Sequence, residues 1–190
     1  EAAGRIAQNA PDVQGLEIGD VVAVNPGLAC GHCAMCLAGL SNHCTDMRFY
    51  GSAMRNPHVD GAFRRDLVCK AVQCVRGHHK SPADLALAEP FAVALHAVRR
   101  AGALLGKKVL ITGAGPIGTL VAVAARLNGA RRVIVTDILS EPLAIARKAG
   151  ADEVINGREE PDALAALKGQ VDVMIECSGN EQALRNGIEL

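Results

Sequence analysis

The feature that most restricts the fold of this chain is a glycine motif in its second half, where residues 113–118 read Gly-Ala-Gly-Pro-Ile-Gly. The apolar run 108–112 predicts a strand directly before this G-x-G-x-x-G spacing, and the apolar periodicity of 116–128 predicts a helix that begins within it. A strand, a glycine turn and a helix in this order are typical of the first part of a dinucleotide-binding fold. The alternative is a glycine-rich turn in a fold that binds no nucleotide.

Each glycine of the motif has a distinct role in that arrangement. Gly113 permits the tight turn, Gly115 lets a pyrophosphate approach the backbone, and Gly118 lets the helix pack closely on the strand. The N-terminus of the helix adds free N–H groups and a positive dipole, which favour phosphate. The loop residues predicted to bind a dinucleotide cofactor are Gly113, Gly115, Pro116, Ile117 and Gly118.

Asp137 follows the next predicted strand, 132–136, and comes about 20 residues after Gly118, the spacing typical of a ribose-binding acid. In this place a carboxylate accepts hydrogen bonds from the adenosine ribose and repels a 2′-phosphate. Residues 138–141 contain no Arg or Lys that could hold such a phosphate. The sequence therefore predicts Asp137 as a cofactor-binding residue, and NAD rather than NADP as the cofactor.

The second half alternates predicted strands with predicted helices, which indicates an α/β fold with a parallel sheet and helices on its faces. The first half has short apolar runs separated by turn residues, which is typical of an irregular β-rich domain. The helical segment 88–101 is expected to connect the two, so we predict one domain over 1–89 and another over 90–190. The predicted strands are 4–7, 21–24, 67–69, 108–112, 132–136, 153–155 and 171–176, and the predicted helices are 88–101, 116–128, 141–149 and 162–168.

Four cysteines, Cys30, Cys33, Cys36 and Cys44, follow one another at the spacing C-x2-C-x2-C-x7-C. Closely spaced thiolates on one loop can reach the corners of a tetrahedron, and four sulfur ligands form a closed zinc site that is structural and leaves no open position for chemistry. Two disulfides and unpaired buried thiols are the alternatives. His32 and His43 are possible substitute ligands, but with four cysteines present we expect both to be solvated or to lie behind the ligands.

The chain has seven cysteines, and an odd number without a secretion signal argues against a disulfide scaffold. The cysteines outside the cluster are expected to be small core residues. These cysteines are Cys69, Cys74 and Cys177. Among the histidines, His96 is expected to lie in the core, and His78 and His79 are expected to be solvated.

The composition excludes several classes of partner. Twenty basic and twenty acidic residues cancel, and the aromatic residues are three Phe, one Tyr and no Trp, so the charge and the stacking surfaces that nucleic-acid binding requires are missing. No apolar stretch approaches the roughly 20 residues that cross a bilayer, and the first residues do not resemble a signal peptide. We expect a cytoplasmic protein with an aliphatic core that binds neither nucleic acid nor membrane.

With a β-rich domain, a four-cysteine lobe, a connecting helix and a dinucleotide-binding domain in this order, the chain resembles the zinc-dependent medium-chain dehydrogenases. Local stretches agree with that family, including 19–24, 60–63, 88–90 and 176–179. The resemblance implies a GroES-like catalytic domain that is incomplete at its N-terminus, followed by a Rossmann domain that is incomplete at its C-terminus. It also implies a homo-oligomer, either a dimer or a tetramer.

The resemblance further implies hydride transfer to the nicotinamide, with a second, catalytic zinc that binds the substrate hydroxyl as a Lewis acid. Glu1 matches the glutamate of the family's Gly-His-Glu segment, and Glu89 matches the glutamate at the domain junction. These two are the expected catalytic residues and zinc ligands, either directly or through water. The family's cysteine and histidine ligands would precede Glu1, so we expect the chain to be a fragment.

Two segments narrow the resemblance within the family. Residues 89–96 resemble the sorbitol dehydrogenase branch, and residues 47–54 resemble the L-idonate 5-dehydrogenases. The implied reaction is oxidation of a secondary alcohol of a polyol or sugar acid by NAD, and the first expected substrate is L-idonate, which would give 5-ketogluconate. A threonine or simple alcohol dehydrogenase of the same architecture and a non-catalytic NAD-binding relative are the alternatives.

Overall fold

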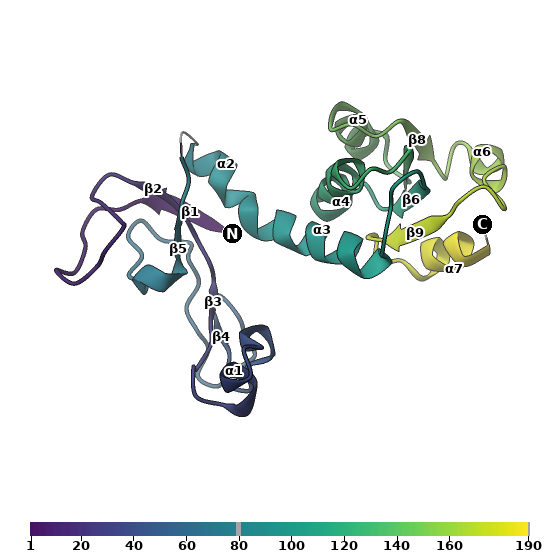
Figure 1. Cartoon of the computed structure of the whole chain (residues 1–190). Coiled ribbons are helices and arrows are strands. Elements are labelled where there is room, and N and C mark those ends of the chain that lie inside the picture. The colour runs from purple at the N-terminus through teal and green to yellow at the C-terminus, as the bar shows by residue number, and fades with distance from the viewer. Residues whose placement is uncertain (79–80, 190) are drawn as a thin grey trace. The chain divides into compact units, whose positions relative to one another are not determined.

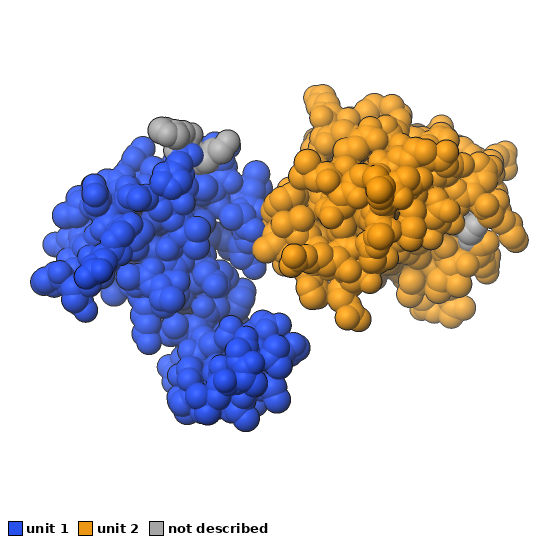
Figure 2. Space-filling model, viewed as in Figure 1, with its two compact units in different colours: residues 1–89 blue, residues 90–190 orange. Residues whose placement is uncertain are grey.

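The computed structural model describes residues 1–78 and 81–189, and the chain forms two compact units, Glu1–Glu89 and Pro90–Leu190 (Figure 2). The division falls in the first turn of helix α3 (Ala88–Ala101). No helix among the described residues is long and apolar enough to cross a membrane. His79 lies outside the described residues, while His78 is exposed, as expected.

The second unit is built on a parallel four-stranded sheet in the order β8-β7-β6-β9 (Figure 1). Val109 of β6 pairs with Val133 of β7 on one side and with Val173 of β9 on the other, so these strands end at the same edge. The chain proceeds from β6 outward to β8 and then returns to the far side of β6, so the strand order reverses between β6 and β9. The strands are β6 (Lys108–Thr112), β7 (Arg132–Asp137), β8 (Glu153–Asn156) and β9 (Val173–Glu176).

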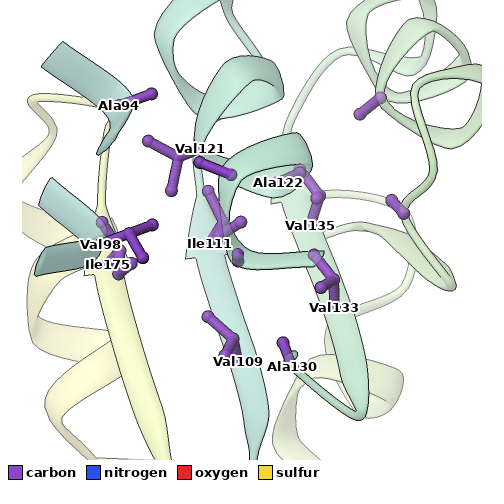
Figure 3. Close-up of a cluster of buried hydrophobic side chains, with 14 of the residues drawn as sticks. Ala94, Val98, Val109, Ile111, Val121, Ala122, Ala130, Val133, Val135 and Ile175 are labelled. Atoms are coloured by element: carbon purple, nitrogen blue, oxygen red, sulfur yellow. The ribbon is translucent and has the colours of Figure 1, made fainter. Parts of the chain in front are cut away.

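Alternate residues of the central strands point to opposite faces of this sheet, as the period of a strand requires. Val109, Ile111 and Val133 are buried together with residues of α3, α4 and α5 (Figure 3). Leu110 and Ile134 are buried on the other face, where residues of α6 and of the loop before β9 pack against them. The helices in contact with the sheet include α4 (Pro116–Leu127), α5 (Ser140–Lys148), α6 (Pro161–Ala165) and α7 (Glu181–Glu189).

The first unit contains an antiparallel sheet in the order β1-β2-β5 and a separate pair, β3 and β4. In the central strand of the sheet Val22 and Val24 are buried, because alternate residues of a strand share a face. Its short elements are β1 (Ala2–Arg5), β2 (Val21–Val24), β3 (Gly27–Leu28), α1 (Ala34–Leu37), the 3-10 turn Ser41–His43, β4 (Arg48–Phe49), the 3-10 turn Ala71–Gln73, β5 (Cys74–Arg76) and α2 (Pro82–Ala86).

The strand predicted at 67–69 is wrong. These residues are not in a strand, and Val68 is exposed. The edge of β2 is paired with β5 instead, where Cys74 lies opposite Val24 and Arg76 lies opposite Val22. An apolar triplet without alternation defines no buried face. The local pattern therefore could not show whether residues 67–69 or the later segment β5 would pair with β2.

The expected core position of His96 is also wrong, because its side chain is exposed. α3 buries Pro90, Ala94 and Val98, which recur every four residues. His96 comes two positions after Ala94, which places it about half a turn away around the helix. The strand predicted at 108–112 and the helix predicted at 88–101 have the bounds of β6 and α3, and the other elements predicted in the second half are present with shifted ends. α7 is a helix that we did not predict.

Candidate zinc and cofactor sites

The four clustered cysteines converge on one point of the first unit. Their Sγ atoms all lie within 4.8 Å of one another, and the pairs Cys30–Cys36 and Cys33–Cys44 are each 4.0 Å apart. A tetrahedral zinc with Zn–S bonds of about 2.3 Å separates its sulfurs by about 3.8 Å, so this set fits the metal with small adjustments. The four are free thiols, at distances about twice the length of a disulfide bond.

Short backbone elements bring these cysteines together. The paired strands β3 and β4 place Leu28 opposite Arg48 and so close the loop that carries the cluster. Within the loop the N–H of Cys33 donates to Sγ of Cys30 at 3.4 Å, and the N–H of Cys30 donates to Sγ of Cys44 at 3.2 Å. Such bonds orient the sulfurs within the loop.

The thiols of the cluster differ in acidity. Hydrogen bonds from the N–H groups of Cys36 and Thr45 lower the pKa of Cys33 to about 5, and the N–H of Cys30 lowers the pKa of Cys44. Desolvation raises the pKa of Cys36 to about 12. Because zinc binds thiolates, the cluster is partly prepared for the metal, and the proton of Cys36 would leave when the metal binds.

His32 and His43 are not part of this ligand group. Both side chains are exposed, and the metal-binding group found among the described residues contains cysteines alone. Nδ1 of His32 lies 3.0 Å from the carbonyl oxygen of Cys30, so the ring contacts the backbone of a ligand. The expectation that both histidines are solvated is therefore consistent with the structure.

The glycine turn joins β6 to α4 in the second unit. Gly113 has a φ of +91°, and a Cβ there would lie 2.7 Å from the backbone nitrogen of Ser178. A Cβ on Gly118 would overlap the carbonyl oxygen of Gly113. Gly115 caps the helix and has open space beside it. The turn thus has room for a ligand at Gly115 and no room for side chains at the other two glycines.

A cavity of about 560 Å³ lies at the carboxyl edge of the sheet, where the strand order reverses between β6 and β9. Ligands of doubly wound sheets bind at such a reversal, and this volume is in the usual range for small-molecule sites. Among the predicted cofactor residues, those lining it are Gly113, Gly115 and Asp137. Pro116, Ile117 and Gly118 do not line it, and Ile117 packs against the hydrophobic core.

Asp137 links the end of β7 to the glycine turn. Its Oδ2 accepts a hydrogen bond from the N–H of Ala114 at 2.7 Å, and its Oδ1 accepts from the N–H groups of Ile138 and Leu139 at 2.7 and 3.0 Å. A carboxylate has about four acceptor positions, so Asp137 can accept further hydrogen bonds on the side that lines the cavity.

Several residues that line the cavity were missed by sequence reasoning. They follow the carboxyl ends of β8 and β9 or lie on α7, and they are Gly157, Cys177, Ser178, Asn180, Gln182 and Asn186. The available signal was positional, because residues just after parallel strands meet at one edge of the sheet. Burial, together with the nearby charge of Glu176, raises the pKa of Cys177 to about 11, so this thiol is protonated at neutral pH.

The two glutamates expected at a catalytic zinc lie in the first unit. Glu1 is exposed just before β1, and Glu89 is half-buried in the first turn of α3. Among the described residues, the group of side chains able to hold a metal contains neither of them. A catalytic zinc takes three protein ligands, so these residues alone do not form a complete catalytic site.

Two family descriptions match most of the chain. Residues 116–190 match the zinc-binding dehydrogenases, and residues 1–79 match the alcohol dehydrogenase GroES-like domain. The chain is 40% identical over 192 residues to L-idonate 5-dehydrogenase (NAD(P)(+)) of Escherichia coli, an alignment that covers 100% of this chain and 55% of that protein. It is 38% identical over 199 residues to sorbitol dehydrogenase of Bacillus subtilis, with 99% of this chain and 54% of that protein covered.

The crystal structure of L-idonate 5-dehydrogenase from Escherichia coli superposes on this chain with a TM-score of 0.89 at 40% identity, covering 99% of this chain and 54% of that one. The chain therefore belongs to the zinc-binding medium-chain dehydrogenases, in the polyol dehydrogenase branch. The predicted GroES-like domain followed by a Rossmann-type domain is confirmed, and the four cysteines form the structural zinc site. The chain spans about half the length of the curated relatives it matches.

Replacing Cys44 with Ala should remove the zinc of this lobe, because three sulfurs would leave an open and weaker site. Elemental analysis of the purified full-length protein should find one zinc fewer per chain in C44A than in the unaltered protein. Cys69→Ala is the matched control, since this thiol lies outside the cluster, and it should leave the zinc content unchanged. Equal zinc contents in C44A and the unaltered protein would contradict the assignment of Cys44 as a ligand.

Proposed function

We propose that this protein is an NAD-dependent dehydrogenase that oxidises a secondary alcohol of a polyol or sugar acid. In this reaction the alcohol carbon loses a hydride to the nicotinamide, and its hydroxyl loses a proton. The observation that carries the proposal is the cavity at the strand reversal, lined by Gly113, Gly115 and Asp137. On one side of this cavity lies a turn that admits a pyrophosphate, and on another lies a carboxylate that can accept hydrogen bonds from ribose hydroxyls. Because the chain spans 55% of the similar Escherichia coli protein, the activity is proposed for a protein of that length.

The substrate class is supported by two similar proteins, an L-idonate 5-dehydrogenase and a sorbitol dehydrogenase. L-idonate, with 5-ketogluconate as the product, is the first substrate that we propose. NAD is proposed as the preferred cofactor, because a carboxylate at Asp137 would repel the 2′-phosphate of NADP. We further propose a homo-oligomer, a dimer or tetramer, as the family resemblance implies.

The residues of this chain would act mainly by binding and orienting the cofactor. The N–H groups at the start of α4 would bind the diphosphate, and Asp137 would bind the adenosine ribose. Glu1 and Glu89 are proposed as ligands of a catalytic zinc, directly or through water, in a site to which other residues of the full-length protein contribute. The cysteine cluster would hold its lobe together and take no part in the reaction.

Cofactor preference should change when Asp137→Ser is combined with Ile138→Arg. The pair of substitutions removes the charge that repels the 2′-phosphate and supplies a guanidinium that binds it, so the ratio of kcat/KM for NADP to that for NAD should rise by about 100-fold. Steady-state kinetics of the full-length protein with both cofactors give this ratio. Ile138→Arg alone is the control and should shift it much less, because the carboxylate remains. An unchanged ratio in the double variant would show that preference is determined elsewhere.

Activity should depend on Glu89. In the full-length protein we expect Glu89→Ala to lower kcat/KM with the preferred substrate by about 10–100-fold, through a weakened catalytic zinc site, while the structural zinc is retained. Glu141→Ala is the matched control, since Glu141 is also an acidic residue in the first turn of a helix and is exposed. The assay compares L-idonate, sorbitol, threonine and ethanol with NAD. Turnover of threonine or ethanol alone, or of none of the four, would overturn the proposed substrate class.

A further inference from the structure

A single carboxylate, that of Glu176, joins the ends of the two strands between which the strand order reverses. Glu176 is the last residue of β9, and its Oε1 accepts hydrogen bonds from the N–H of Ser178 at 2.6 Å and from the N–H of Gly179 at 3.1 Å. The hydroxyl of Ser178 donates to the same oxygen. On the neighbouring strand the hydroxyl of Thr112, the last residue of β6, donates to Oε1 of Glu176 at 3.4 Å.

The turn that Glu176 organises lies directly against the glycine turn. A Cβ on Gly113 would lie 2.7 Å from the backbone nitrogen of Ser178 and 2.8 Å from its Cα, so the two backbones are in contact. Cys177 and Ser178 line the cavity beside Gly113 and Gly115. A shift of the turn after β9 would therefore change both the shape of the cavity and the space next to Gly113.

The carboxylate is held in its ionised form. Burial raises the pKa of Glu176, but hydrogen bonds from the hydroxyl and N–H of Ser178 and from the N–H of Gly179 outweigh burial, and the pKa lies below its ordinary value. An ionised acceptor forms the strongest of these hydrogen bonds. Without an acceptor oxygen at position 176 the N–H groups of Ser178 and Gly179 would lose their partner next to the cofactor site, and the turn would be free to rearrange.

We propose that Glu176 is a positioning residue for cofactor binding, because its hydrogen bonds hold the turn 176–179 against Gly113 and thereby fix the wall of the cavity. Glu176 itself does not line the cavity, so it acts through Ser178 and Gly113 rather than by touching the cofactor. This inference rests on the proposed function, since it presumes that the cavity binds NAD. It goes beyond that function by assigning a role to a residue outside the glycine motif.

The test is a titration of the full-length protein with NADH, followed by fluorescence, in three variants. Glu176→Ala should raise the Kd by at least about tenfold, the effect of losing one strong hydrogen bond or more. Glu176→Gln should stay within about threefold of the unaltered protein, because its amide oxygen still accepts from both N–H groups. Glu153→Ala is the matched control, since Glu153 begins β8, the neighbour of β7, and accepts from Arg132 instead.

In steady-state kinetics the KM for NAD should rise in Glu176→Ala, while kcat at saturating NAD and the KM for the alcohol change little. A Kd unchanged in Glu176→Ala, or raised equally in the Ala and Gln variants, would overturn the role of these hydrogen bonds. If the Ala variant fails to fold, Thr112→Val is compared with Thr112→Ser, which keeps the hydroxyl donor, because Thr112 also lines the cavity. A Kd raised in the Val variant alone supports the inference, and a Kd that is unchanged in it or raised equally in both overturns it. Absence of NADH binding in the unaltered protein would overturn the proposed function itself.

Discussion

The contact between Gly118 and the carbonyl oxygen of Gly113 is the constraint on which the second unit depends, because a single added Cβ would fill the space between them. This contact lets α4 begin after a turn of only three residues, 113–115, that follows β6, so the N-terminus of the helix lies at the carboxyl edge of the sheet. The same close packing buries Val121 and Ala125 of α4 in the main core. The cavity and its proposed affinity for a diphosphate both follow from this placement.

The first unit is stabilised in a different way. Within residues 25–72, all of which the structure describes, Cys44 is the one side chain classed as buried, so burial of apolar surface contributes little to this lobe. Four thiolates on one metal replace a core in such small lobes, because metal binding supplies free energy of folding directly. Arg55 adds local support by donating to the carbonyl oxygens of Thr45 and Met47, next to the last ligand.

The features that were predictable from the sequence are those defined by short-range spacing. The cysteine cluster lies within residues 30–44 and the glycine turn within residues 113–118, and the β-α alternation follows from local periodicity. Contacts between distant residues could not be read in this way. The hydrogen bond from Thr112 to Glu176 spans 64 positions. The edge of β2 is paired with β5 and not with residues 67–69, and that outcome depended on which of the two segments reached this edge in the folded chain. The cavity lining from α7 was missed because that helix was not predicted at all.

The most direct test of this account is NADH binding to the full-length protein with and without a side chain at position 118. The unaltered protein should bind NADH, and Gly118→Ala should weaken binding by at least about tenfold, because the added Cβ must displace the turn that carries the phosphate-binding N–H groups. Gly4→Ala is the control, since a Cβ there meets no atom within 4 Å. Undiminished NADH binding by a folded Gly118→Ala protein would contradict the claim that this glycine turn forms the cofactor site.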